Sequence, residues 1–305
     1  MLSSLICVLF ALITLWSVNA TVLMSDTFQN SPCMKFFYKN QELTGFEDSN
    51  YARICQSFRD RYYFASLYDK ERRIPLYSAS LFNYKDPLDK ETDMSNEHWK
   101  YEAQLAYPSQ NGNMQQIDSK VKDDPIIKQS QPVEIDYNKL YQKVKYTRGH
   151  LNPNSYMGSK SSKASTFTVT NAPPQPRGFN QEQWRNTENR MLGLLNDKCH
   201  VVSGVIPYQA EKWIPDNTER RVAVPEFVWM AYCCPDHQPP TGAVLGHSDG
   251  SGTVTIGEGA DKLQFKPAEI KDIEVCQLEA ILRSRLQPKN PISIFKDGCN
   301  QGFIH

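Results

Sequence analysis

Hydrophobic residues recur with the spacing of β-strands in some segments of this chain and with the spacing of α-helices in others. Arg61–Tyr68 and Ile74–Tyr84 are rich in aromatic and branched residues and flank the polar turn 69–73, which predicts a β-hairpin. Alternation of apolar and polar residues is typical of a half-buried strand. Three further strand patterns follow: Thr166–Thr170, His200–Ile206 and Val222–Tyr232.

Helical spacing marks two longer segments. One begins at Phe179 and runs to about Asp197, and the other, Glu274–Leu286, is a late amphipathic helix. We expect a short helix at Lys139–Val144 and mostly loops in Ser31–Asp60 and Lys85–Pro132. Because strands cluster while helices are few and separated, the pattern predicts an α+β fold with a central, largely antiparallel sheet flanked by helices.

The first twenty residues differ from the rest of the chain. Leu2–Val18 is apolar and carries no charge, and Val18-Asn19-Ala20 ends on a small residue. This predicts a cleaved signal peptide at residues 1–20 and a secreted, extracellular protein, with a retained membrane anchor as the alternative. Residues 21–305 are then expected to form a single domain with cysteine-containing extensions at both ends.

Cysteine usage agrees with export. Seven cysteines remain after residue 20, so at most three disulfides can form and one thiol is left over. Cys33 and Cys55 are a plausible local pair, and the other pairings are not readable from the sequence. The cluster Cys233, Cys234 and His237 also suggests zinc, but no second pair completes four ligands, so disulfides are favoured.

The net charge of zero hides a local asymmetry. No Asp or Glu occurs between Tyr137 and Gln181, and the same window is basic. Such a window is either a solvated basic face or a surface that binds nucleic-acid phosphates. Its seven basic residues are Lys139, Lys143, Lys145, Arg148, Lys160, Lys163 and Arg177.

His150 lies in this acid-free window and is followed by the turn-forming Leu151–Asn154. Asn180 opens the following helix, and Glu188 lies within about 80° of it on an ideal helix. Amide and carboxylate oxygens are ligands that Mg²⁺ prefers, and a neutral imidazole can activate water. Spacing alone leaves this site and an ordinary helix cap at Asn180 equally open.

A different motif, Gly246-His247-Ser248-Asp249-Gly250, matches the nucleophile elbow of serine hydrolases. That elbow must turn directly into a helix and be followed by a later histidine. Here Gly-rich residues lead into a strand pattern, and the only later histidine is His305. The sequence therefore disfavours a serine hydrolase.

Several motifs in order closely resemble the DNA/RNA non-specific endonucleases, which are ββα-metal nucleases. The segments Cys33–Tyr38 and Val228–Cys234 look like the endonuclease domain-containing 1 branch of that family. The resemblance spans roughly Cys33 to Leu286 and is strongest between Tyr146 and Met191. The matching motifs are Arg148-Gly149-His150, Thr170-Asn171-Ala172-Pro173-Pro174-Gln175, Phe179-Asn180-Gln181, Trp184 and Glu188.

The resemblance implies a ββα-metal nuclease fold that hydrolyses DNA or RNA internally with little sequence preference. It implies that His150 is the general base and that Asn180 is the protein ligand of Mg²⁺ or another divalent cation such as Mn²⁺. Glu188 would orient a metal-bound water, Asn171 and Gln175 would support the site, and Arg148 would act on phosphate. The residues expected to bind the nucleic-acid backbone are Lys160, Lys163 and Arg177.

Two positions depart from the family pattern. Thr147 stands where the motif normally begins with Asp. An upstream Arg contacts phosphate in the bacterial members, and here the best local match offers Glu97 at that position, with Lys100 as the candidate substitute. These departures support an alternative hypothesis, in which the chain is a nuclease-fold module that binds nucleic acid or another partner without turnover. The retained His150, Asn180 and Glu188 favour an active enzyme.

Overall fold

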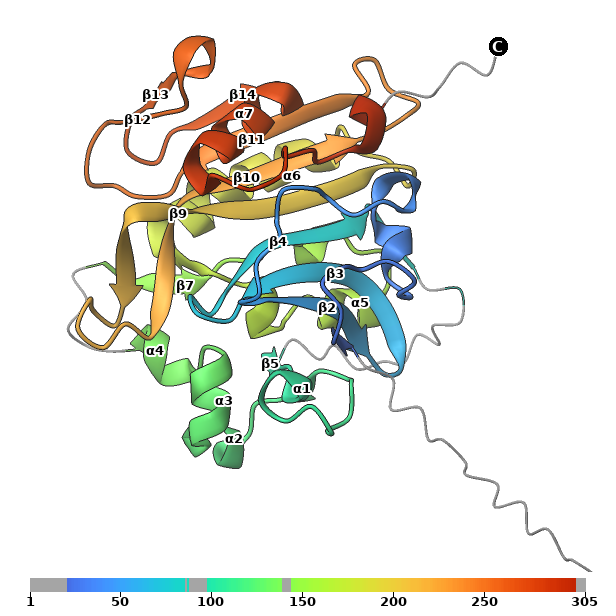
Figure 1. Cartoon of the computed structure of the whole chain (residues 1–305), viewed down its shortest axis with the longest axis vertical. Coiled ribbons are helices and arrows are strands. Elements are labelled where there is room, and N and C mark those ends of the chain that lie inside the picture. The colour runs from blue at the N-terminus through green and yellow to red at the C-terminus, as the bar shows by residue number, and fades with distance from the viewer. Residues whose placement is uncertain (1–20, 86, 88–97, 139–143, 300–305) are drawn as a thin grey trace, which may run out of the picture.

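The computed structural model describes residues 21–85, 87, 98–138 and 144–299 (Figure 1). The expected signal peptide, and the expected helix at Lys139–Val144 apart from its last residue, lie outside these ranges. No helix of the described part is both long and apolar enough to cross a bilayer.

A single eight-stranded sheet forms the centre of the molecule, with the strand order β1-β2-β3-β4-β9-β10-β11-β14. Every neighbouring pair in this sheet is antiparallel, as the sequence predicted. The strands are β1 (Val22–Leu23), β2 (Tyr51–Phe58), β3 (Arg61–Asp69), β4 (Ile74–Leu81), β9 (His200–Ile214), β10 (Val222–Cys233), β11 (Thr241–His247) and β14 (Ile270–Ile273).

Smaller elements surround this sheet. Three two-stranded ladders are β5 (Lys100–Tyr101) with β6 (Gln115–Gln116), β7 (Tyr146–Arg148) with β8 (Pro174–Pro176), and β12 (Val254–Ile256) with β13 (Leu263–Phe265). The helices are α1 (Ala103–Ala106), α2 (Ser119–Asp123), α3 (Pro125–Ser130), α4 (Glu134–Asn138), α5 (Lys160–Ser165), α6 (Arg185–Leu192) and α7 (Val275–Leu286).

Most of the expected elements are present. The hairpin is β3–β4, the strands at His200 and Val222 are longer than expected, and α7 starts one residue after the predicted position. Both loop predictions were partly wrong, because Ser31–Asp60 contains β2, and Lys85–Pro132 contains several short elements. The expected strand Thr166–Thr170 is also wrong, since it is a turn followed by a 3-10 helix at Val169–Asn171.

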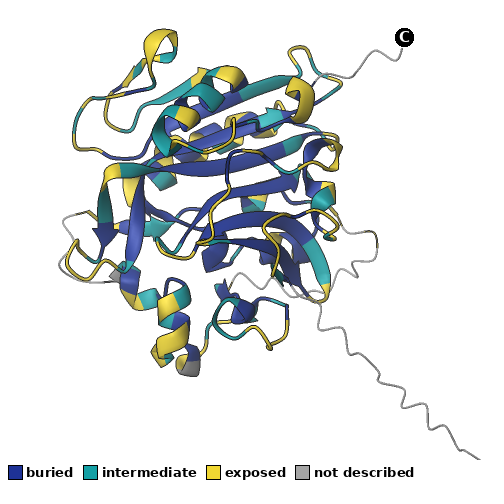
Figure 2. Ribbon diagram, viewed as in Figure 1, coloured by how far each residue is buried: buried dark blue, intermediate teal, exposed yellow. Residues whose placement is uncertain are grey.

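Helical elements cover both faces of the sheet. In Figure 1, α7 and the N-terminal turns lie on the viewer's side, and α5 and α6 lie behind the strands. The central strands are buried along most of their length, as Figure 2 shows. Trp229, Tyr77 and Phe227 are among the largest fully buried side chains, so removal of apolar area from water holds the two layers on the sheet.

The described residues form three disulfides, two of which tie an N-terminal and a C-terminal segment to this core. Cys33 bonds to Cys55, which confirms the pairing favoured by the sequence. The adjacent residues Cys233 and Cys234 bond to different partners, Cys299 and Cys199. Cys276 is the one free, exposed cysteine of the described chain. His237 lies near Cys199 and Cys234. The sulfurs of these two cysteines are joined in a disulfide, so they cannot serve as the ligands of a zinc site.

Candidate active site

The sequence between Tyr146 and Leu192 folds into two short strands followed by a helix. β7 and β8 pair in antiparallel register with Thr147 opposite Gln175, and the ladder continues where the Gly149 amide donates to the Pro173 carbonyl at 3.1 Å. A π-helical turn, Phe179–Trp184, then leads into α6. Single π-helical turns within helices are frequent at functional sites, and this one carries Asn180.

His150 lies directly after β7, packed between two aromatic rings. Its ring centroid is 5.2 Å from that of Trp99 and 4.8 Å from that of Phe167. The imidazole is half-buried, and its Nε2 is buried without a hydrogen-bond partner. This burial lowers the pKa of His150 to about 4, so the imidazole is neutral at physiological pH, which is the form that can accept a proton.

Arg148 points from the same strand, two residues before His150, and is also held by aromatic rings. Its guanidinium carbon is 5.1 Å from the Trp99 ring centroid and 4.8 Å from that of Tyr137. No carboxylate of the described residues pairs with it at ion-pair distance, and its Nε is buried without a partner. A guanidinium held in this way keeps its charge available for a phosphate.

Thr147 and Asn180 join β7 to the helix. The Asn180 Nδ2 donates to the Thr147 hydroxyl oxygen at 3.0 Å, which leaves the amide oxygen Oδ1 for another partner. The Thr147 hydroxyl in turn donates to the Gln175 carbonyl at 3.3 Å. The residue that departs from the family motif therefore orients the candidate metal ligand.

Gln175 and Asn171 are both fully buried, but their surroundings differ. Neither side-chain polar atom of Gln175 has a partner, and its amide packs on Gly149, where any Cβ would be 2.2 Å from it. Asn171 accepts from Ser78 Oγ and from the Asn152 amide, both at 2.9 Å, and its Nδ2 donates to two carbonyls. Asn171 thus fixes the loop after His150, without a polar atom left for substrate.

Glu188 lies on α6, half-buried. Burial raises the pKa of its carboxyl to about 8, and the Trp184 indole and Arg185 oppose the rise. The ideal-helix spacing assumed for Asn180 and Glu188 does not hold, because the π-helical turn intervenes. Among the described residues, Asn180 forms its side-chain hydrogen bond with Thr147 and none with Glu188.

Unpartnered buried polar atoms gather in this unit. They are His150 Nε2, Arg148 Nε and both side-chain polar atoms of Gln175. Buried polar groups are normally satisfied, so such a concentration indicates a place where water, an ion or substrate completes the bonding. Together with the free amide oxygen of Asn180 and the carboxyl of Glu188, the oxygen donors present fit a hydrated divalent cation.

The remaining predicted residues lie outside this cluster. Lys160 and Lys163 are exposed on α5, and Arg177 is exposed at the end of β8, where its Nε donates to Gln181 at 2.9 Å. Lys100 does not replace the missing upstream arginine, because it is buried and its Nζ donates to the His98 and Ala164 carbonyls at 2.9 Å. Sequence reasoning missed Trp99, although it lies beside Lys100 and is an aromatic residue between two basic ones.

The serine-hydrolase motif is structural. Ser248 is buried, and its hydroxyl donates to the Pro225 carbonyl at 2.7 Å and to that of Glu226 at 3.0 Å. β11 ends at His247, and the chain does not turn into a helix directly after the serine. An elbow nucleophile must be exposed at such a turn, so this serine is not one.

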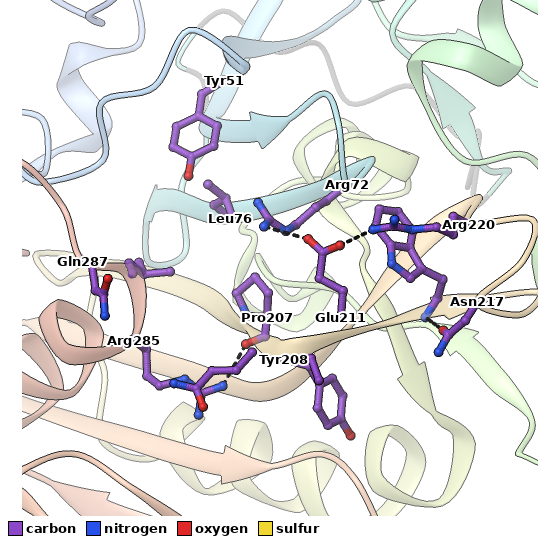
Figure 3. Close-up of a pocket in the computed structure, with 14 residues that line it drawn as sticks. Tyr51, Arg72, Leu76, Pro207, Tyr208, Glu211, Asn217, Arg220, Arg285 and Gln287 are labelled. Atoms are coloured by element: carbon purple, nitrogen blue, oxygen red, sulfur yellow. Dashed lines mark hydrogen bonds and ion pairs between the residues drawn. The ribbon is translucent and has the colours of Figure 1, made fainter.

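A cavity of about 780 Å³ contains none of these residues (Figure 3). Glu211 lines it and pairs with both Arg72 and Arg220, Arg72 also pairs with Asp69, and Arg285 pairs with Glu226. Its charges are therefore compensated within the protein, and no free charge is left to select a ligand.

The DNA/RNA non-specific endonuclease family profile matches residues 43–275, and the chain belongs to this family. Membership of this family supports a nuclease-type function. The human endonuclease domain-containing 1 protein is 28% identical over 88% of this chain and 48% of its own length. The mouse protein of that name is 25% identical over 93% of this chain and 50% of its own length.

The chain thus spans about half the length of these curated relatives. A crystal structure of the EndoG/EndoGI complex, described as showing the mechanism of EndoG inhibition, matches with a TM-score of 0.42 and 15% identity. That match covers 71% of this chain and 78% of the matched chain, and the likeness is too distant to carry an argument.

Proposed function

We propose that this chain is a secreted, divalent-metal-dependent endonuclease that hydrolyses phosphodiester bonds of DNA, RNA or both. The observation that carries the proposal is the position of His150, a neutral imidazole beside an unpaired arginine and the unpartnered donors and acceptors of the β7–β8 unit. The three disulfides support an oxidising, extracellular location.

The chemistry follows from these groups. A water oxygen attacks phosphorus, one phosphorus–oxygen ester bond breaks, and the imidazole of His150 takes the proton that the water loses. Arg148 stabilises the charge that develops on the phosphoryl oxygens.

Asn180 and Glu188 are the residues that would hold Mg²⁺, or another divalent cation such as Mn²⁺, directly or through water. When bound, the cation stabilises charge on the phosphate and on the leaving oxygen. Thr147 supports this role because its hydroxyl accepts from the Asn180 Nδ2 and leaves Oδ1 free.

A second candidate function is a nuclease-fold module that binds nucleic acid without cleaving it. Thr147, which replaces the family aspartate, is the observation that favours it. The intact set of His150, Asn180 and Glu188 weighs against it, because a module without turnover has no need of a neutral imidazole beside oxygen donors.

Cleavage of supercoiled plasmid and of a long RNA by the purified chain, with Mg²⁺, with Mn²⁺ and with EDTA, tests the proposal. We expect nicking or RNA degradation that EDTA abolishes and added Mg²⁺ restores. Cleavage that EDTA leaves unchanged would overturn the metal-dependent mechanism. An inert chain that still binds DNA would favour the module.

A further inference from the structure

A smaller cavity opens beside the candidate active site. It has a volume of about 320 Å³, and its wall includes Trp99 and Arg148. Trp99 also contacts His150, with ring centroids 5.2 Å apart, so the cavity lies next to the candidate base. Ligand pockets usually range from about 300 to 1,000 Å³, so this one is large enough for a single small ligand such as one nucleotide.

The charges around this cavity leave one cation uncompensated. Lys122 and Glu134, on the wall, form an ion pair at 2.8 Å, which largely cancels their charges. Arg148 has no such partner among the described residues and is held between the Trp99 and Tyr137 rings. A single phosphate is the complement of such a fixed guanidinium.

The other wall residues offer contacts that do not depend on base identity. Trp99 is half-exposed, and His98 and Gln116 are exposed beside it. Stacking on an aromatic side chain tolerates any base, because every base has a π face. A stacking wall and one phosphate-binding cation are what a non-specific nuclease needs for a nucleotide that flanks the cleaved bond.

We propose that this cavity is a nucleotide subsite for the substrate strand, with the phosphate on Arg148 and the base against Trp99. The inference rests on the proposed function, and it adds the residues that hold the nucleotide next to the cleaved phosphate. Glu134 also lines this cavity, and its carboxylate weakens the attraction for a phosphate because it neutralises Lys122.

Binding of thymidine 5′-monophosphate to the whole chain in EDTA, measured by isothermal titration calorimetry, tests this subsite without cleavage. Thymidine and inorganic phosphate are the partial ligands, and each should bind at least tenfold more weakly than the nucleotide. Trp99→Ala should weaken binding at least tenfold and Trp99→Phe only slightly, which separates stacking from loss of the fold.

Glu134→Gln should tighten binding severalfold, because it leaves Lys122 unpaired beside the phosphate. Asp236→Asn is the matched control, since Asp236 also pairs with an exposed lysine, Lys198, away from the cavity. Equal affinities in wild type, Trp99→Ala and Glu134→Gln would overturn the subsite, as would an equal gain in Asp236→Asn. Plasmid nicking by the same preparations reports separately on the proposed function.

Discussion

At the scale of single residues, His150 combines properties that a general base requires. Its neutral form persists because burial lowers its pKa to about 4, and Trp99 and Phe167 fix its ring. The cost is one buried nitrogen without a partner, which a structural histidine would normally avoid. An energetically unfavourable arrangement of this kind is typical of functional sites.

Replacing His150 by Ala should lower the rate of plasmid nicking by about 10²–10⁴-fold, the usual contribution of a positioned general base. Binding of DNA in EDTA should be retained, because phosphate attraction comes from Arg148 and exposed lysines and not from a neutral imidazole. Initial rates and gel-shift titrations of the two proteins measure both effects. Cleavage by His150→Ala near the wild-type rate would disprove the assignment.

Thr147 is the second residue whose role can be tested directly. Thr147→Asp should raise the nicking rate, because a carboxylate accepts more strongly from the Asn180 Nδ2 than the hydroxyl does. A charge-assisted hydrogen bond contributes about 1.5–3 kcal/mol where it forms, and only the part gained in the transition state affects the rate. Thr147→Val, which lacks the acceptor, should be slower than wild type.

Rates at matched Mg²⁺ and salt decide between the two proposed functions. A protein that has abandoned catalysis would have lost its alignment at several positions, so one carboxylate would not restore cleavage. If wild type and Thr147→Asp are equally inert while both still bind DNA, the binding module is the better description.

At the scale of elements, a buried polar network fixes the segment that follows α5. Thr168 and Thr170 donate to the Glu102 carboxyl at 3.3 and 3.4 Å, and Thr170 accepts from the Gln56 Nε2 of β2 at 2.9 Å. This network explains why Thr166–Thr170 is not the predicted strand. The hydroxyls of Thr168 and Thr170 satisfy a buried acid, a partner far away in sequence that periodicity does not reveal.

The same network predicts a pH dependence of stability. Burial raises the pKa of Glu102 to about 8, so between about pH 4.5 and 8 the folded state holds a proton that the unfolded state releases. Stability should therefore fall as pH rises through this window. In Glu102→Gln this decline should be reduced, and thermal unfolding of both proteins from pH 5 to 8 measures it. Parallel curves would contradict the assignment.

Elements with a regular spacing of hydrophobic residues, and motifs of consecutive residues, could be predicted from the sequence. The β3–β4 hairpin, the long strands and α7 depend on neighbouring residues, and they were predicted from their spacing. The packing of Trp99 on His150 could not be predicted in this way, because the two residues lie about fifty positions apart in the sequence. The π-helical turn was also missed, since an apolar spacing typical of an α-helix does not reveal one wider turn.

At the scale of the whole molecule, the two faces of the sheet differ in their disulfides and in how their charges are paired. One face carries α7 and the N-terminal turns, tied by Cys33–Cys55 and Cys233–Cys299, and the cavity lined by Glu211 has its charges paired internally. The β7–β8 unit, α5 and α6 lie on the other face, behind the strands of Figure 1. The described part of the acid-free window, residues 144–180, belongs to that second face, so a protein with no net charge can still have basic residues concentrated around its site.

This distribution of charge predicts the salt dependence of binding. Each phosphate neutralised by a lysine or arginine adds about −0.9 to the slope of log affinity against log salt. If Lys160 and Lys163 on α5 contact the backbone, the double change Lys160→Glu, Lys163→Glu should weaken DNA binding and make the slope shallower by about two. Anisotropy titrations of a labelled duplex in EDTA, at several salt concentrations, measure the slope.

The matched control is Lys262→Glu, Lys266→Glu, which makes the same change in net charge at two exposed lysines near β13. A surface that binds phosphate locally should respond to the α5 pair far more than to the β13 pair. Equal effects would mean that DNA responds only to the total charge of the protein. An unchanged slope in the α5 variant would show that this part of the window is a solvated face, and would leave Arg148 and Arg177 as the phosphate contacts to test next.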